Sequence, residues 1–342
     1  MNITNTSSTS NPVFIPPEVK TALYSSIFVL GLFGNSFVIT VLARKRSSRT
    51  CHDIFICNLA ISDLILLLTY FPMFFAHAVG NFKAPRVFCK LIWPLITISY
   101  LSSILIITSM AIHRSRMIVN PYTSEISRRN VYIWIFCLRI MSFVCILPGM
   151  VFAEVNRMGM CHVAWPSVEA HVVFRFFMLM VQYLLPLTIT AVAYIRIGLA
   201  INRSKFHRKF SKQPKALSQT RRRENAQVVR TIATIVIIFA ICMFPKHLAS
   251  IYYYFGENGK EKGKILFRLL HISEIFAVFH SCLNPLVYGT VMKHFRAEYF
   301  KYLQGIFCYC WKTRAERMSN PGDQMTSLND PRSSSKMTAS SE

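Results

Sequence analysis

Residues 265–291 read ILFRLLHISEIFAVFHSCLNPLVYGTV, an apolar stretch that carries Asn284, Pro285 and Tyr288 near its end. A helix that crosses a bilayer needs about 20 consecutive, mostly apolar residues, and this stretch has that length. An amphipathic basic segment follows it over residues 292–304. The pattern predicts a membrane-spanning helix that leads into a short helix on the membrane surface.

Six more stretches of the same kind precede this one. They run over residues 22–43, 54–79, 88–112, 131–153, 172–195 and 228–255. Lipid satisfies no backbone hydrogen bonds, and the strands of a membrane barrel would be about half as long and would alternate in polarity. The sequence therefore predicts an all-α membrane protein, a seven-transmembrane helix bundle over residues 22–291 with a short amphipathic eighth helix.

Composition and charge agree with a membrane protein. Hydrophobic residues make up 53% of the 342 residues and charged residues only 16%, which is unusual for a soluble domain. The net charge of +24 would suit a nucleic-acid partner, but the basic residues collect in the loops after the first, third and fifth spans. The positive-inside rule places such loops in the cytoplasm, so we expect membrane lipids and no nucleic acid as partners.

Seven spans then place residues 1–21 on the outside of the cell. Asn2 and Asn5 each begin an Asn-x-Ser/Thr sequon, which is a glycosylation site only on a lumenal or extracellular segment. We expect a multi-pass protein of the plasma membrane with a glycosylated extracellular N-terminus. At the other end, residues 305–342 are expected to form a disordered cytoplasmic tail. This tail is polar and Ser/Thr-rich from residue 311 onward, and it is either phosphorylated or simply solubilising.

Two of the ten cysteines fall at extracellular ends of the predicted spans. These are Cys89 and Cys161, so one pairing is possible in the oxidising compartment, and we predict that disulfide. Cys308 and Cys310 follow the last span beside aromatic residues. They are predicted palmitoylation sites, with ordinary reduced thiols as the alternative.

Polar side chains inside the spans are costly to bury, so they mark function or tie helices together. The predicted polar cluster consists of Asn35, Asp63, Ser103, His280, Ser281 and Asn284. It could be a hydrated site for a cation such as Na⁺, or for a proton, near Asp63. The alternative is a hydrogen-bond network that only packs helices, and we expect no other cofactor or metal.

One landmark on each span makes residues 20–310 resemble a rhodopsin-like (class A) G-protein-coupled receptor. In chain order the landmarks are Gly34 with Asn35; Leu59, Ala60 and Asp63; Cys89 and Arg114, with Pro121 and Tyr122 in the next loop; Trp134; Pro186 and Tyr194; Phe239, Cys242 and Pro245; Asn284, Pro285, Tyr288 and Phe295. Each landmark alone is weak, but the ordered set is specific.

The resemblance implies a mechanism in which an extracellular ligand favours one helix arrangement and the sixth helix swings outward to admit a heterotrimeric G protein. It also implies arrestin and receptor kinases as partners. The predicted G-protein switch consists of His113, Arg114, Tyr194, Tyr288, Asn284 and Pro285. Arg114 is its centre, and Tyr194 and Tyr288 would support the active position of Arg114.

The chain departs from the family pattern at three positions. His113 stands where an acid usually precedes the switch arginine, Ser115 replaces the usual tyrosine, and Met243 replaces a tryptophan on the sixth span. An acid would form an ion pair with Arg114 and hold it in the inactive position, whereas a neutral imidazole cannot. We hypothesise raised basal signalling, weakened coupling or pH sensitivity.

The ligand class follows from the predicted pocket. Ile96 replaces the aspartate of amine receptors, and Val278 replaces the lysine that binds retinal. The predicted pocket residues are Thr97, Tyr100, Arg175, Gln182, Met243, Lys246, His247, His271 and Glu274. Lys246 and Glu274 either pair with each other or present opposite charges to the ligand. The mixture favours a peptide, and Arg175 with Lys246 leaves an acidic lipid or a small carboxylate as the alternative.

Two other classes of protein can have seven membrane spans. A scavenger or arrestin-only receptor with weak G-protein coupling would also explain His113 and Ser115. A transporter would show repeated halves or glycine-broken helices, and the sequence shows neither. No nucleophile, base and orienting residue stand together in the pattern of a catalytic site, so an enzyme is not expected.

Overall fold

The computed structural model describes residues 16–45, 49–78, 83–120, 126–157, 159–208, 215–255, 260–302 and 304. Within these ranges, seven helices are long and apolar enough to cross a membrane. The predicted seven-helix fold is confirmed.

The elements follow one another in a simple order. They are α1 (Pro17–Arg44), α2 (Cys51–Ala78), η2 (Phe88–Ile92), α3 (Pro94–Val119), α4 (Arg128–Val151), β1 (Ala153–Val155), β2 (Cys161–Val163), α5 (Val168–Leu179), η3 (Met180–Leu184), α6 (Leu185–Arg208), α7 (Lys215–Phe255) and α8 (Lys260–Val291). The third span is η2 with α3, and the fifth span is α5, η3 and α6 together. The sixth and seventh spans are α7 and α8.

Local sequence explains where two of the helices begin. The hydroxyl oxygen of Ser127 accepts a hydrogen bond from the backbone N–H of Asn130 at the start of α4, and Ser167 does the same for Ala170 at the start of α5. Each serine satisfies an N–H group that the first helical turn leaves without an intrahelical partner.

The fifth span is interrupted by one irregular turn near Pro186. A π-helical turn, η3, separates α5 from α6 and ends just before Pro186. Proline lacks the N–H that would bond to the carbonyl four residues earlier, and its ring crowds that carbonyl. The wider π turn accommodates both effects and sets Gln182 within the irregular segment.

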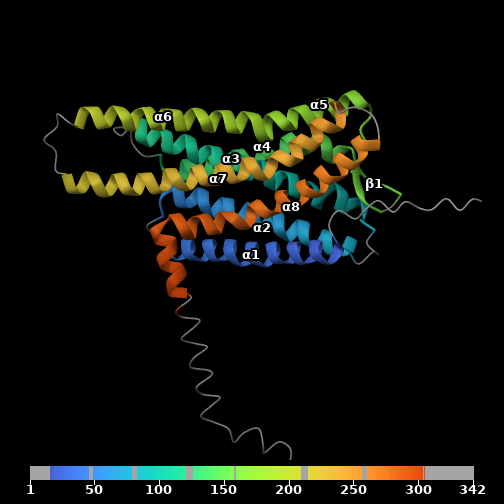
Figure 1. Cartoon of the computed structure of the whole chain (residues 1–342), viewed down its shortest axis with the longest axis horizontal. Helices are drawn as coiled ribbons and strands as arrows, with labels where there is room; N and C mark the ends of the chain where they lie inside the picture. Colours follow the sequence, from blue (N-terminus) through green and yellow to red (C-terminus); the bar gives the residue numbers. More distant parts are fainter. Residues whose placement is uncertain are drawn as a thin grey trace, which may run out of the picture. The chain divides into compact units, whose positions relative to one another are not determined.

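Figure 1 shows the membrane helices side by side, with β1 at one end, called here the hairpin end. The C-terminal end of α6 and the N-terminal end of α7 lie at the opposite end. The third span is the central one, because it contacts α2, α4, α6 and α7. In the most apolar part of the third span, 72% of the residues are buried, compared with 28% in the fourth span and 22% in the fifth.

A short antiparallel hairpin covers the hairpin end. β1 pairs with β2 in the register Ala153↔Val163 and Val155↔Cys161. The predicted disulfide is confirmed, since Cys89 in η2 is bonded to Cys161 in β2. Gly159 has a φ of +78°, and an added Cβ there would lie 3.1 Å from the Cα of Lys83, so this turn requires glycine.

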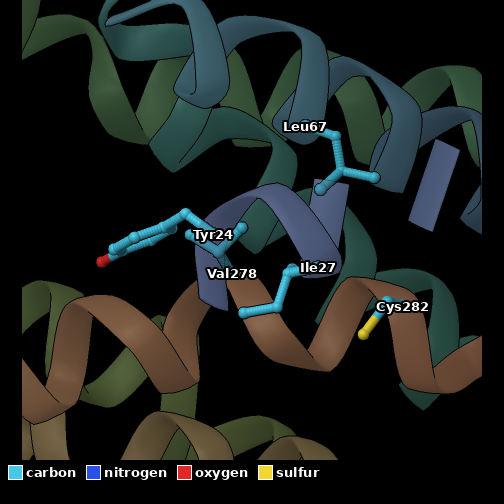
Figure 2. Close-up of a cluster of buried hydrophobic side chains, with 5 residues drawn as sticks. All are labelled: Tyr24, Ile27, Leu67, Val278 and Cys282. Atoms are coloured by element: carbon cyan, nitrogen blue, oxygen red, sulfur yellow. The ribbon is translucent and has the colours of Figure 1, made fainter. Parts of the chain in front are cut away.

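Helices α1, α2 and α8 meet in a buried apolar cluster. Tyr24 and Ile27 come from α1, Leu67 comes from α2, and Val278 and Cys282 come from α8. Figure 2 shows these side chains between their ribbons. The cluster packs the first and last spans together, so it ties the N-terminal helix to the helix that carries Asn284 and Pro285.

Gly34 allows the close approach of α1 to α8. A Cβ added at Gly34 would lie 2.9 Å from the Cβ of Pro285, and the proline ring has little freedom to move away. We expect Gly34→Ala to destabilise the protein by about 1–3 kcal/mol, which lowers the unfolding temperature by about 2–4 °C per kcal/mol. Thermal unfolding of the purified protein measures this.

The matched control for Gly34 is Gly198 on α6. A Cβ added at Gly198 meets nothing within 4 Å, and alanine is the better helix former by about 1 kcal/mol. Gly198→Ala should therefore leave the unfolding temperature unchanged or slightly raised. Equal effects of the two substitutions would refute the packing role of Gly34.

Residues 293–302 form a further helix, in keeping with the short eighth helix of the predicted fold. It belongs to a second unit that begins at Lys293. Within it, the Nζ of Lys301 lies 2.9 Å from the Oε1 of Glu298. Its place on the membrane surface stays a prediction, as do the predicted segment boundaries.

Candidate functional site

The predicted polar cluster is built around Asp63, which lies fully buried in α2. The amide Nδ2 of Asn284 on α8 donates to its Oδ2 at 2.7 Å. Its other oxygen, Oδ1, is buried and has no hydrogen-bond partner among the residues that the structure describes. Asp63 therefore ties α2 to α8 while keeping one acceptor available to water, a proton or a cation.

Asn35 makes a second polar tie between the first and last spans. Its Nδ2 donates to the carbonyl of Gly31 at 2.9 Å and to the carbonyl of Ser281 at 3.0 Å. Its Oδ1 is buried and lacks a partner within the described ranges. The hydroxyl of Ser281 donates to the carbonyl of Val278, so the side chain of Ser281 serves its own helix.

His280 joins this region from α8. Its Nδ1 lies 2.7 Å from the carbonyl of Ala277, and its ring lies 5.5 Å from that of Tyr100 on α3 and 5.6 Å from that of Phe239 on α7. Ser103 is buried on α3. The unpartnered oxygens of Asp63 and Asn35 are hard oxygen ligands of the kind that bind alkali and alkaline-earth cations.

The predicted switch residues His113 and Arg114 lie near the C-terminal end of α3. His113 is buried, with its ring 6.0 Å from that of Phe55 on α2. His52, also on α2, is buried close by, and the charges of Arg114 and Lys45 act on it. Basic groups and imidazoles gather here, at the place where the family pattern puts an acid.

The other switch residues occupy separate positions. The hydroxyl of Tyr194 on α6 donates to the backbone carbonyl of Val229 on α7 at 3.0 Å, which ties the fifth span to the sixth. Tyr288 on α8 is fully buried. Asn284 is bonded to Asp63, and Pro285 packs beside Gly34. Asn284 thus links the predicted switch to the polar cluster.

Two of the predicted pocket residues, both on α7, contact aromatic rings of other spans. The Nζ of Lys246 lies 4.9 Å from the centre of the Tyr100 ring, which is a cation–π arrangement. His247 lies with its ring 4.7 Å from that of Tyr183 on η3. Met243 is buried one turn before Lys246. These contacts join α7 to α3 and to the fifth span.

Three more pocket residues lie on the third and fifth spans. The Nε of Arg175 donates to the Nε2 of His171 at 3.1 Å, and its charge acts on Lys246 and His247. Gln182 is buried, and its Nε2 has no partner in the part of the chain described here. Thr97 is half-buried on α3.

Glu274 does not pair with Lys246, which corrects one of the two predicted arrangements. The Oε2 of Glu274 lies 3.4 Å from the Nζ of Lys20 on α1. No ion pair joins Lys246 to Glu274 within the described ranges. The Nζ of Lys20 also lies 5.8 Å from the ring centres of Tyr24 and Phe74. Lys20 was not predicted as this partner, because it lies in the first turn of α1 and is far from Glu274 in the chain.

Arg139 and Trp134 on α4 were also without predicted partners. The Nη2 of Arg139 donates to the Oδ1 of Asn58 on α2 at 3.2 Å. The Nε1 of Trp134 donates to the hydroxyl of Ser109 on α3 at 2.9 Å. These bonds hold α4 against α2 and α3, so the two side chains serve packing.

A hollow of about 510 Å³ lies near the disulfide, lined by Arg86, Val87, Lys90 and Leu91. None of these belongs to the predicted pocket. Arg86 is 3.6 Å from Glu154 of β1, and Lys90 donates to the carbonyl of Val151. Arg86 thus contacts the hairpin, and Lys90 contacts the end of α4.

The predicted roles of the site residues stay predictions, and five of these residues lie wholly or in part outside the described residues. Asn2, Asn5, Cys308 and Cys310 lie outside the residues that the structure describes. The backbone of His271 is part of α8, but its side chain lies outside the described part of the chain.

Comparison with known proteins decides the family. The family described as 7 transmembrane receptor (rhodopsin family) matches residues 34–288. The chain belongs to this family. Receptors of this kind are not enzymes, and the seven apolar helices agree with a multi-pass receptor of the plasma membrane.

Three relatives of the receptor are 26–29% identical to it over the aligned residues. The type-1 angiotensin II receptor A of Xenopus laevis is 26% identical over 313 residues, covering 86% of this chain and 81% of the relative. The human galanin receptor type 1 is 29% identical over 294 residues, covering 82% and 80%. The bovine somatostatin receptor type 5 is 27% identical over 298 residues, covering 83% and 76%.

Proposed function

We propose that this receptor binds an extracellular peptide and responds by activating heterotrimeric G proteins. The observation that carries the proposal is the set of charged and aromatic side chains that four helices bring to the hairpin half of the bundle. Glu274, Lys246 and Arg175 are charged, and the ring of Tyr100 lies beside Lys246. A peptide offers backbone groups, charged groups and apolar side chains that suit such a mixture.

The relatives support a peptide ligand. Those compared above are named as receptors for angiotensin II, galanin and somatostatin. Ile96 supplies no counterion for an amine ligand, and Val278 supplies no amine for retinal. The side with the N-terminus and the hairpin is then extracellular, so the peptide would approach past the β1–β2 hairpin.

Activation would act through the sixth span. Pro245 interrupts the hydrogen-bond ladder of α7 and allows its two halves to pivot. A ligand that binds better to the pivoted arrangement shifts the equilibrium toward it. Movement of α7 away from α6 would break the Tyr194–Val229 bond and open the opposite end of the bundle, beside Arg114, to the G protein. Arrestin and receptor kinases would act on the same end.

The Asp63 cluster would modulate this step. A Na⁺ ion held by the unpartnered oxygens of Asp63 and Asn35 would favour the arrangement in which α1, α2 and α8 are tied together. The cluster would have to lose the ion, or take up a proton, when α8 shifts.

The experiment that tests the proposal measures G-protein dissociation in cells that express the receptor and are exposed to pools of secreted peptides. A response absent from untransfected cells supports the proposal, and single peptides are then isolated from the active pool. A parallel arm with fatty acids and small carboxylates tests the alternative ligand class. Recruitment of arrestin by a peptide pool without G-protein dissociation would refute G-protein activation and identify an arrestin-only receptor.

A further inference from the structure

Charge balance distinguishes the two charged groups of the predicted pocket. Glu274 has a cationic partner, because the Nζ of Lys20 lies 3.4 Å from its Oε2. Lys246 has no carboxylate partner among the residues that the structure describes. The pocket therefore carries a positive charge on α7 that has no carboxylate partner among the described residues, while its acid on α8 is paired with Lys20.

The ring of Tyr100 compensates Lys246 only in part. The Nζ lies 4.9 Å from the ring centre, and a cation–π contact contributes about 0.5–2 kcal/mol. Holding an ammonium group among membrane helices costs several kcal/mol unless an anion accompanies it. Lys246 thus sits in a place where an incoming anion would be stabilised.

The fifth span supplies a cation and a hydrogen-bond donor on the same side of the predicted pocket. The charge of Arg175 acts on Lys246, and its own hydrogen bond goes to an imidazole rather than to an acid. Gln182, on the neighbouring fifth span, keeps its amide Nε2 buried without an acceptor in the described part of the chain. A carboxylate has acceptor oxygens for an ammonium, a guanidinium and an amide N–H.

We propose that Lys246 is the subsite for a carboxylate of the ligand, and that the charge of Arg175 on α5 adds to the attraction. The inference rests on the proposed peptide function and sharpens it: the peptide presents a free C-terminus or an acidic side chain to α7. Glu274 and Lys20 form a structural tie between α8 and α1 and do not recognise a cation of the ligand.

The position of Lys246 connects this subsite to the switch. Lys246 directly follows Pro245 in α7. Tyr100 contacts both Lys246 and His280 of α8, and the ring centres of Tyr100 and His280 are 5.5 Å apart. A carboxylate that draws Lys246 off the Tyr100 ring changes contacts among α3, α7 and α8 at the proline itself. The ligand's charge would therefore act at the pivot.

Thermal unfolding of the purified full-length receptor tests the subsite without any signalling step. The probes are N-acetylphenylalanine, which mimics a peptide C-terminus, and octanoate, which mimics a fatty acid. Each is compared with its neutral amide at about 10 mM, a concentration suited to millimolar affinities. We expect N-acetylphenylalanine to raise the unfolding temperature by about 2–4 °C and its amide to leave it unchanged.

Substitutions assign the effect to Lys246. Lys246→Gln should abolish the shift, and Lys246→Arg should keep it because the positive charge remains. Lys20→Gln is the matched control, since it removes a cation that already has an acid partner, and the shift should persist. If Lys246→Gln does not fold, Arg175→Gln should still reduce the shift by at least half.

The subsite would be overturned if neither carboxylate raised the unfolding temperature of the wild type, or if acid and amide raised it equally. It would also be overturned if the folded Lys246→Gln variant kept the full rise in unfolding temperature. Where Lys246→Gln does not fold, a full rise in Arg175→Gln would overturn it. Stabilisation by octanoate alone would support the carboxylate subsite but contradict the peptide ligand. Stabilisation by N-acetylphenylalanine without a G-protein response to any peptide pool would support the subsite and refute the proposed signalling. The two failures are thus distinguishable.

Discussion

Ligand-free G-protein activation is expected to fall about tenfold when His113 is replaced by aspartate, and to reach background when Arg114 is replaced by alanine. An aspartate at position 113 would place a carboxylate beside the guanidinium of Arg114, in a buried setting against Phe55. A hydrogen bond between charged groups contributes about 1.5–3 kcal/mol, and 1.4 kcal/mol already shifts a two-state equilibrium tenfold. Arg114→Ala removes the group that the G protein would contact.

The measurement is basal G-protein activation in cells at matched surface expression. His113→Asn is the control, because asparagine has the shape of aspartate without its charge, and it should leave basal activity close to that of the wild type. A result in which His113→Asp signals as strongly as the wild type would show that the imidazole is not what releases Arg114.

Replacing Cys89 by serine is expected to lower surface expression severalfold and to destabilise the folded receptor. The disulfide closes a loop of 72 residues between Cys89 and Cys161, and the loop-closure entropy alone corresponds to about 4 kcal/mol. The bond also holds β2, and with it the whole hairpin, against the start of the third span. Surface labelling and thermal unfolding in detergent measure the two effects.

Two controls separate the disulfide from the loss of a thiol. Cys161→Ser, and the double variant Cys89→Ser with Cys161→Ser, should behave like the single variant because each lacks the same bond. Cys137 is a free, exposed cysteine on α4, and Cys137→Ser should have no effect. A stable, fully expressed Cys89→Ser receptor would contradict a stabilising role for the disulfide.

The spans and the disulfide could be predicted from the sequence because both follow from local rules. A run such as residues 265–291 must be helical wherever it crosses lipid, whatever its neighbours are. Cys89 and Cys161 were the only cysteines expected outside the cell, so the topology left one pairing. The π turn before Pro186 was missed, since a proline predicts a disturbance of the helix but not the form that the disturbance takes.

Partners inside the bundle were harder to foresee, as Glu274 shows. The sequence offered Lys246 and Glu274 as a pair, because both lie on apolar helices near the same end. The structure pairs Glu274 with Lys20, which is 254 positions away, and leaves Lys246 over the ring of Tyr100. Arg139 likewise found its acceptor, Asn58, on another helix.

By itself, the sequence determined seven helices, their order and the set of polar residues buried among them. These follow from hydropathy and from the cost of an unsatisfied backbone in lipid, which act on each segment separately. The tertiary structure alone decided which polar groups meet, because a contact between two helices depends on how both are rotated and how closely they approach. Three such contacts are Gly34 with Pro285, Asn284 with Asp63 and Lys20 with Glu274. The last of them leaves Lys246 without a carboxylate partner among the residues that the structure describes.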